Sequence, residues 1–324
     1  MYYDRVDRLD TDTGAVRDAT IAVVGAGATG SRMLEQLAGL GCDLHIVDRD
    51  YLERPNLATS ALYTAEDVEE GLPKAVAAAQ RLAATTPEIE VDAAVADVNH
   101  RTVDEHLAGA DLVLDGTDNI TTRQLINEWS CAQDVPWVHV AALGRRGTAM
   151  PVVPGETACF RCAVGDVDGA ALPTCETAGI SPAAAGAAAS LGVAAAIDIL
   201  AGDVDGGMAR VDLAADRSRT LDVARRPDCP VCGEGERPHL SGAAGTGTTQ
   251  VCGEDQYQVR PESGAVDLDA LAAELEGLGA VTQNEHLLRF DGGEQFTVFR
   301  DGRMLVEADS PEQAKQVYAR FVGA

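Results

Sequence analysis

The chain has 324 residues, 46% of them hydrophobic, which allows one large and one small domain and excludes a mostly disordered chain. It carries 52 acidic against 25 basic residues, a net charge of −27, and its only lysines are Lys74 and Lys315. Binding of nucleic acid needs basic stripes, so we expect no such partner. This acidic, arginine-over-lysine composition is typical of a halophile's protein, in which salt screens self-repulsion. An acidic partner-binding face is the alternative.

Residues 1–10 contain no apolar signal core, so we expect no secretory peptide and a cytoplasmic location. The alanine-rich run 183–201 is interrupted by Gly186, Gly192 and Asp198, and we interpret it as a buried helix and expect no membrane span. Thiols stay reduced in the cytoplasm. The eight cysteines therefore indicate metal binding or chemistry and not disulfides.

Apolar runs and helical patterns alternate along the first half of the chain. An apolar run enters a glycine-rich turn within 20–30 and is followed by a helix to about Leu40. Further strands are expected at 43–48, 89–97, 110–119, 136–144 and 147–154, the last completing the sheet, with helices at 74–85 and 121–133. This alternation predicts an α/β fold with a doubly wound, mainly parallel, Rossmann-like sheet.

The end of the chain has a different pattern. Residues 241–250 are of low complexity and predict a linker between a domain at 1–240 and a small α+β domain at 251–324. In this small domain we expect strands at 256–261, 286–290, 294–300 and 303–308 and helices at 268–278 and 311–322.

Gly25, Gly27 and Gly30 form a G-x-G-x-x-G motif that directly follows a strand and opens a helix. The glycines allow a tight turn and a close approach of phosphates to backbone N–H groups. Asp48 ends the next strand and is placed to hydrogen-bond a ribose. These residues predict a nucleotide site, and the motif alone fits NAD, FAD or ATP.

Two C-x-x-C pairs, Cys159 with Cys162 and Cys229 with Cys232, have the spacing of a structural zinc site. Each spacer lets two thiolates reach one tetrahedral Zn²⁺, and four thiolates close its shell. A redox pair is the alternative. Four ligands are enough for zinc, so Cys175 is not needed as a fifth.

Two residues outside the glycine motif point to phosphate chemistry. Asp118 follows the fourth strand at the sheet edge where ligands bind, and its carboxylate suits Mg²⁺ held against phosphates. The alternative is an ordinary turn capped by Asn119 or Thr121. Lys74 follows Leu-Pro at a helix start and predicts a phosphate contact, with an incidental surface lysine as the alternative.

In this order the motifs resemble the ThiF/MoeB/HesA family, the E1-like adenylyltransferases that activate ubiquitin-like sulfur carriers. The resemblance covers about residues 1–235 and rests on YYDRV, VVGAGATGS, DRDYLERPNL, GLPKA, LVLDGTDN with TRQLIN, the CFRC and CPVC pairs, and TCETAG. It implies a homodimer that uses ATP and Mg²⁺ to adenylylate a carrier ending in Gly-Gly, with a sulfurtransferase as a further partner. The last segment resembles a small extension found in some such proteins.

The resemblance also assigns roles to individual residues. It implies that the residues that bind ATP are Gly25, Gly27, Gly30, Asp48, Asp50, Asn56 and Lys74, with Asp118 on the metal. Arg5 would reach into the partner's site in a dimer. Cys175 stands where relatives carry a cysteine that can form a sulfur link to the activated carrier, and a small packed residue is the alternative there.

One position departs from the family pattern Asn-Leu-x-Arg-Gln, whose arginine contacts the phosphates. Thr59 stands at the arginine position. Losing an arginine that stabilises a transferring phosphate costs on the order of 10³-fold or more in related chemistry. Three hypotheses follow: Arg54 or Arg145 substitutes, the enzyme is slow or needs a partner, or the site is a non-catalytic scaffold that binds nucleotide or carrier.

The glycine motif alone would also fit an NAD-dependent oxidoreductase of the Rossmann type. A hydride-transfer enzyme does not require the two cysteine pairs, Lys74 or Asp118, so this hypothesis is disfavoured. We therefore expect an ATP-dependent adenylyltransferase.

Overall fold

The computed structural model describes residues 3–9, 11–165, 178–244, 249–250, 256–259 and 265–322. The chain divides into two compact units, Met1–Ala244 and Gly245–Ala324. Each unit is described by itself.

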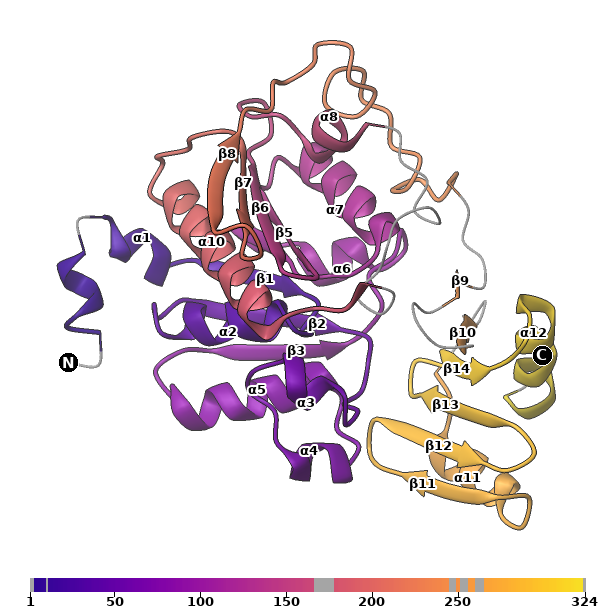
Figure 1. Cartoon of the computed structure of the whole chain (residues 1–324). Coiled ribbons are helices and arrows are strands. Elements are labelled where there is room, and N and C mark those ends of the chain that lie inside the picture. The colour runs from indigo at the N-terminus through magenta and orange to yellow at the C-terminus, as the bar shows by residue number, and fades with distance from the viewer. Residues whose placement is uncertain are drawn as a thin grey trace. The chain divides into compact units, whose positions relative to one another are not determined.

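The first unit is built on an eight-stranded sheet in the order β3-β2-β1-β4-β5-β6-β7-β8 (Figure 1). Its strands are β1 (Thr20–Val24), β2 (Asp43–Asp48), β3 (Val91–Val95), β4 (Leu112–Asp115), β5 (Trp137–Leu143), β6 (Arg146–Val152), β7 (Met208–Asp212) and β8 (Arg217–Leu221). The strands from β3 to β5 in this order pair in parallel, whereas β6, β7 and β8 are antiparallel additions. The expected α/β fold with a mainly parallel sheet is confirmed.

The expectation that the strand at 147–154 completes the sheet is wrong, because β7 and β8 extend it. The side chains of β8 at Arg217–Thr220 are exposed, and two of these four residues are arginines. A strand at a solvent-facing edge does not need an apolar run, so the pattern that revealed the inner strands was missing here.

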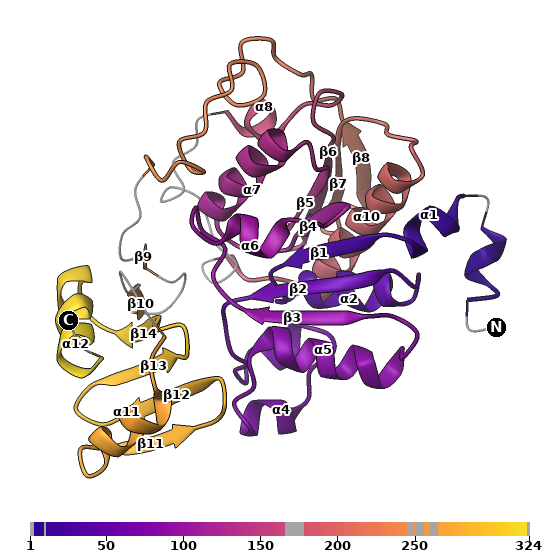
Figure 2. The ribbon, with the colours of Figure 1, turned by 180° about the vertical axis from the view of Figure 1, so that it is seen from behind.

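Helices cover both faces of this sheet (Figures 1 and 2). One face carries α2 (Gly30–Ala38), α5 (Lys74–Thr85) and α10 (Pro182–Leu200), and the other carries α6 (Val103–Leu107), α7 (Ile120–Gln133) and α8 (Phe160–Val164). The short elements outside these layers are η1 (Val6–Arg8), α1 (Thr13–Arg17), α3 (Asn56–Thr59) and α4 (Ala65–Glu69).

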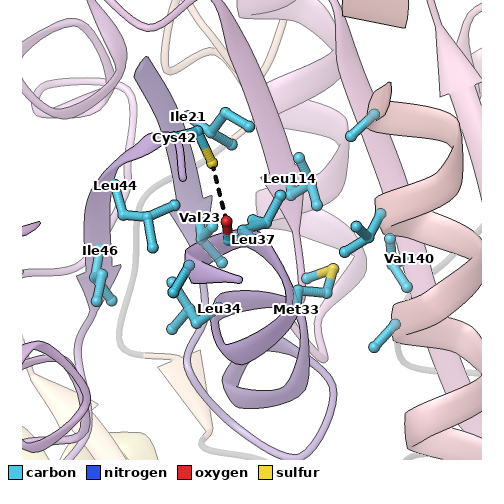
Figure 3. Close-up of a cluster of buried hydrophobic side chains, with 14 of the residues drawn as sticks. Ile21, Val23, Met33, Leu34, Leu37, Cys42, Leu44, Ile46, Leu114 and Val140 are labelled. Carbon is cyan, nitrogen blue, oxygen red and sulfur yellow. Dashed lines mark hydrogen bonds between the residues drawn. The ribbon is translucent and has the colours of Figure 1, made fainter. Parts of the chain in front are cut away.

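The strand β1 shows why the inner strands are apolar throughout. Ile21 and Val23 belong to the core on the α2 side, whereas Ala22 and Val24 belong to the core on the α7 side. Figure 3 shows the first of these cores, in which Met33 and Leu37 of α2 face β1 and β4. A strand buried on both faces needs apolar residues at successive positions, which matches the run TIAVV.

The second unit contains a six-stranded antiparallel sheet in the order β11-β12-β13-β14-β10-β9. Its strands are β9 (Thr249–Gln250), β10 (Gln256–Val259), β11 (Ala280–Gln283), β12 (Leu287–Asp291), β13 (Gln295–Phe299) and β14 (Met304–Glu307), and its helices are α11 (Leu268–Leu275) and α12 (Pro311–Phe321). The core is closed by the rings of Phe290, Phe296 and Phe321. Thus β9 lies at the end of the stretch that the sequence predicts to be a linker.

Among the described helices, α10 alone has the length and apolar composition of a membrane span. In the structure α10 packs along the sheet so closely that some contact positions leave no room for a side chain larger than that of glycine. A Cβ on Gly192 would lie 2.5 Å from Val140 Cγ2, and one on Gly147 of β6 would lie 2.9 Å from Ala188 Cβ. The alanine-rich composition therefore lets the helix backbone approach β5 and β6 closely.

Two glycines of α10 should respond oppositely to alanine. At Gly186 the new Cβ meets only Arg32 Cδ at 3.8 Å, so Gly186→Ala should raise the free energy of unfolding by about 0.5–1 kcal/mol through the helix preference for alanine. Gly192→Ala should lower it by about 1–3 kcal/mol, because Val140 must move. Urea unfolding of both variants measures the difference, and equal shifts would contradict the close packing of α10.

Candidate functional site

The glycine loop lies at the carboxyl end of β1, where the strand order reverses. The strands β2 and β3 lie on one side of β1, and β4 and β5 lie on the other. Ligands of open α/β sheets bind in the crevice at such a point. A Cβ on Gly25 would lie 3.0 Å from backbone atoms of Gly116 and Thr117, so the glycine loop and the loop after β4 are packed backbone against backbone.

The three glycines of the motif have different surroundings. Gly25 has φ +87°, which favours glycine, and a Cβ on Gly30 would lie 1.7 Å from the Gly25 carbonyl oxygen. A Cβ on Gly27 would have no atom within 4 Å. No side chain caps the start of α2, since Thr29 makes no cap hydrogen bond. The backbone at Gly27 and the uncapped helix start can therefore approach an anion.

Asp48 at the end of β2 holds this loop in place. Its carboxylate is buried and accepts hydrogen bonds from Ala26 N at 2.5 Å and from Asp50 N at 2.7 Å. Burial raises the pKa of Asp48 above its ordinary value, and the charge of Lys74 acts in the opposite direction. The hydrogen bond from Ala26 N fixes the glycine loop to the end of the neighbouring strand β2.

Lys74 at the start of α5 is a buried cation. Its side chain is 13% exposed, and its Nζ lies 3.1 Å from Asp50 Oδ2. Burial by itself lowers the pKa of Lys74, but the charges of Asp50 and Asp48 outweigh burial, so the pKa is raised and the amine stays charged. The alternative of an incidental surface lysine is therefore wrong.

The loop after β4 is organised by the buried Asp115. Its carboxylate accepts hydrogen bonds from Thr117 N at 2.9 Å, Thr117 Oγ1 at 2.6 Å and His139 Nδ1 at 3.0 Å, and Arg123 Nε lies 3.5 Å away. Burial alone would raise the pKa of Asp115, but His139 and Arg123 outweigh it and lower the pKa. Burial also lowers the pKa of His139, which favours its neutral form.

Asp118 lies at the tip of the same loop and is exposed. Its negative charge contributes to the raised pKa of both Arg49 and Lys74, which places it on their side of the glycine loop. Asn119 accepts a hydrogen bond from Thr122 N at 2.8 Å and caps α7. The loop after β4 thus contains the helix-capping turn considered in the sequence analysis, and this turn leaves the Asp118 carboxylate exposed to solvent.

Two further residues support the loop region. Asn56 Oδ1 accepts a hydrogen bond from Glu53 N at 2.9 Å, so its side-chain oxygen holds its own turn. Tyr63 donates from its hydroxyl to Ala26 O at 2.5 Å and also lies 3.3 Å from Lys74 O. Tyr63 connects the glycine loop to the start of α5, and no residue pattern in the sequence pointed to it.

The three arginines Arg54, Arg145 and Arg32 have different surroundings. Arg54 is exposed, and Arg145 donates to Leu213 O at 2.7 Å in the turn between β7 and β8. Arg32, which the sequence analysis did not single out, donates from its Nη2 to Thr59 O at 3.1 Å. The structure therefore brings Arg32 to the position that lacks its arginine.

The structure does not bring Arg5 to the glycine loop of its own chain. Arg5 is exposed. The ring of the nearby Tyr3 packs on Gly41, since a Cβ there would lie 2.8 Å from the ring, and the Arg17 guanidinium lies 5.0 Å from the centre of the same ring. Gly41 and Arg17 precede strands, so this segment lies at the amino edge of the sheet (Figure 1). Cys175 lies outside the described residues.

The two C-x-x-C pairs meet in one cluster. The four sulfur atoms of Cys159, Cys162, Cys229 and Cys232 lie within 4.8 Å of one another. The sulfur–sulfur distances are 3.8 Å for 159–162, 3.6 Å for 159–229 and 3.5 Å for 162–232. Four sulfurs placed about 2.3 Å from one tetrahedral metal ion would be roughly 3.8 Å apart, so the cluster fits such an ion.

The helix α7 anchors the segments that carry this cluster. Asn127 accepts a hydrogen bond from Phe160 N at 2.8 Å, directly beside Cys159. The buried Glu128 accepts hydrogen bonds from His239 N at 2.8 Å, His239 Nδ1 at 2.8 Å and Leu240 N at 2.9 Å. The same helix begins at the loop of Asp118, so one element joins the cluster to the candidate nucleotide site.

Two relatives are similar to this chain in sequence over most of their own length. The Sulfur carrier protein ThiS adenylyltransferase of Bacillus subtilis is 33% identical over 321 residues, which cover 95% of this chain and 94% of that protein. The SAMP-activating enzyme E1 of Haloferax volcanii is 33% identical over 227 residues, covering 68% of this chain and 83% of that protein.

A structural neighbour has the same fold in its main part. The crystal structure of Escherichia coli MccB with ATP superimposes with a TM-score of 0.61 at 19% identity, covering 68% of this chain and 69% of that one. Residues 8–231 match the ThiF family. The chain therefore belongs to the ThiF family.

Proposed function

We propose that this protein uses ATP and Mg²⁺ to adenylylate the C-terminal glycine of a ubiquitin-like sulfur carrier. The carrier would carry a C-terminal Gly-Gly, and its acyl-adenylate would then accept sulfur. Family membership and the names of the two relatives support this reaction. The observation that carries it is the buried, charged Lys74 set among Asp48, Asp50 and Asp118 beside the glycine loop.

The reaction joins two anions, so positioning and charge neutralisation are its main demands. The carboxylate of the carrier attacks the α-phosphate of ATP, the bond from this phosphorus to the bridging oxygen breaks, and pyrophosphate leaves. The glycine-loop backbone would hold the phosphates, and Lys74 would offset their charge. The nucleophile is already ionised, so no general base is needed.

Asp118 is the residue that would hold Mg²⁺. Its exposed carboxylate offers oxygen ligands, and Mg²⁺ is commonly bound by one or two carboxylates together with substrate phosphates. When bound, the ion would neutralise part of the phosphate charge. Asp115 would keep Asp118 in position through its hydrogen bonds to Thr117.

Carrier-dependent exchange of pyrophosphate into ATP tests the proposal. The wild-type protein should exchange only with a carrier that ends in Gly-Gly. Lys74→Gln should lower kcat/KM by about 10²–10³-fold, because a cation is lost where charge develops. Lys315→Ala is the matched control, since Lys315 is an exposed residue of α12 in the second unit, and its exchange should be unchanged.

The same assay separates the alternative functions. Binding of ATP without exchange for every Gly-Gly-ended carrier of the same genome would overturn catalysis and support the non-catalytic scaffold. Binding of NADH with preference over ATP would support the oxidoreductase.

We also propose that the four-cysteine cluster binds Zn²⁺ as a closed structural site, as the sulfur–sulfur distances support. The same proposal includes a homodimer in which Arg5 acts across the interface and a cytoplasmic location. It also includes a sulfur link at Cys175 and a sulfurtransferase partner. Arg5 is exposed, which agrees with a role outside its own chain's site.

Cys229→Ser should remove the bound metal and lower the unfolding temperature, because metal binding contributes directly to folding free energy. Metal analysis of the purified protein should fall from one zinc per chain to almost none. Cys42→Ala is the control for metal content. Cys42 is buried beside α2, and burial raises the pKa of its thiol to about 12, so its loss should leave the bound zinc in place. A Cys229→Ser protein that retains its zinc would contradict the site.

The pair of Asp115 and His139 predicts acid sensitivity. The pKa of His139 is lowered in the folded protein, so the unfolded chain binds a proton there that the folded chain does not. The free energy of unfolding should therefore fall as the pH drops below about 6.5, by up to about 1.4 kcal/mol per pH unit. The share of Asp115, whose folded pKa is also lowered, is complete above about pH 4 and is lost only as the pH falls through its folded value.

His139→Asn should flatten this dependence, since asparagine does not titrate. Urea unfolding at pH 7.5 and 5.5 measures the slope of the first unit, with His286→Asn in the second unit as the control. An unchanged slope in His139→Asn would contradict the assignment.

A further inference from the structure

Arg32 lies in the first turn of α2, two residues after the last glycine of the motif. Its Nη2 donates to Thr59 O of α3 at 3.1 Å, and Gly186 of α10 is close enough that a Cβ there would lie 3.8 Å from Arg32 Cδ. Three elements thus surround a half-buried guanidinium beside the glycine loop.

In the described part of the chain, no carboxylate pairs with the charge of Arg32. Among the described residues, no Asp or Glu oxygen lies within 4.0 Å of it, although other arginines of this unit, such as Arg49 and Arg123, form ion pairs. Its Nε is buried and has no hydrogen-bond partner in the described part of the chain. A buried donor without a partner destabilises the protein.

Two features beside Arg32 suit the same anion. The start of α2 has no side-chain cap, and the backbone at Gly27 is open. Helix N-termini bind phosphates through their free N–H groups, and a guanidinium adds planar, charge-assisted donors. The half-buried charge of Arg32, which no described carboxylate pairs, is the independent observation that points to an anion here.

We infer that Arg32 contacts the ATP phosphates and takes the place of the arginine that is absent at residue 59. This inference rests on the proposed function. In this arrangement Thr59 contributes its carbonyl oxygen, which holds Nη2 and fixes the orientation of the guanidinium. Arg54 is exposed and Arg145 bonds to Leu213, so neither has this placement.

The test measures carrier-dependent ATP–pyrophosphate exchange and, separately, the affinities for ATP and adenosine. Arg32→Ala should lower kcat/KM on the order of 10³-fold, as for other arginines that stabilise a transferring phosphate. Arg32→Lys should recover only part of this loss, because lysine lacks the planar fork. Adding Thr59→Arg to Arg32→Ala should restore exchange by returning an arginine to the opposite side of the same contact.

Arg81→Ala is the matched control. Arg81 also donates to a backbone oxygen of the same connection, Leu62 O at 3.3 Å, but it is paired with Asp67. Its exchange rate should be unchanged. Equal melting temperatures of the Arg32 and Arg81 variants would show that both are folded.

The outcomes separate this inference from the proposed function. If the wild-type protein shows no exchange, the proposed function fails, and the affinities still decide about Arg32: Arg32→Ala should weaken ATP at least about tenfold and leave adenosine unchanged. Exchange and ATP affinity of Arg32→Ala within threefold of wild type would overturn the inference. So would an equal loss of ATP and adenosine affinity, which would show a structural role.

Discussion

The backbone contact between the glycine loop and the loop after β4 is the constraint on which the site depends. Gly25 and Gly116 lie so close that a Cβ on either would come within about 3.0 Å of the other loop. The contact sets the spacing of the two strand ends and therefore the distance between the glycine-loop backbone and Asp118. Asp48 and Tyr63 then hold the glycine loop from its other sides.

Buried charge is the second organising feature. Lys74 and Arg49 are largely buried together with carboxylates, of which Asp50 stays 32% exposed, and each cation stays ionised because its partners outweigh burial. Such a network is expensive to desolvate and is weak evidence for stability. Such a network suits the binding of a highly charged substrate, because preorganised charges need no rearrangement during a reaction.

The helix α7 joins this setting to the cysteine cluster. It starts at Asn119 beside the metal-binding candidate Asp118, and its other turns hold Phe160 and His239 through Asn127 and Glu128. Asp115 adds a second connection, because its partner His139 packs against the Phe160 ring at a centroid distance of 4.7 Å. A metal that joins residues 159–162 to residues 229–232 would thus brace the frame of the candidate nucleotide site.

The sequence by itself determined the parts that have local causes: the glycine motif, the apolar inner strands, the two cysteine pairs and, through their order, the family. These patterns are short, and each residue type is required by its own backbone or chemistry. Tertiary structure alone decided the burial of Lys74, the role of Tyr63 and the approach of Arg32 to Thr59. These contacts join residues 11 to 37 positions apart in the chain, and their side chains belong to no periodic pattern. The strands β7 and β8 also escaped prediction, because β7 is only half-buried and the edge strand β8 is exposed, so neither needs an apolar run.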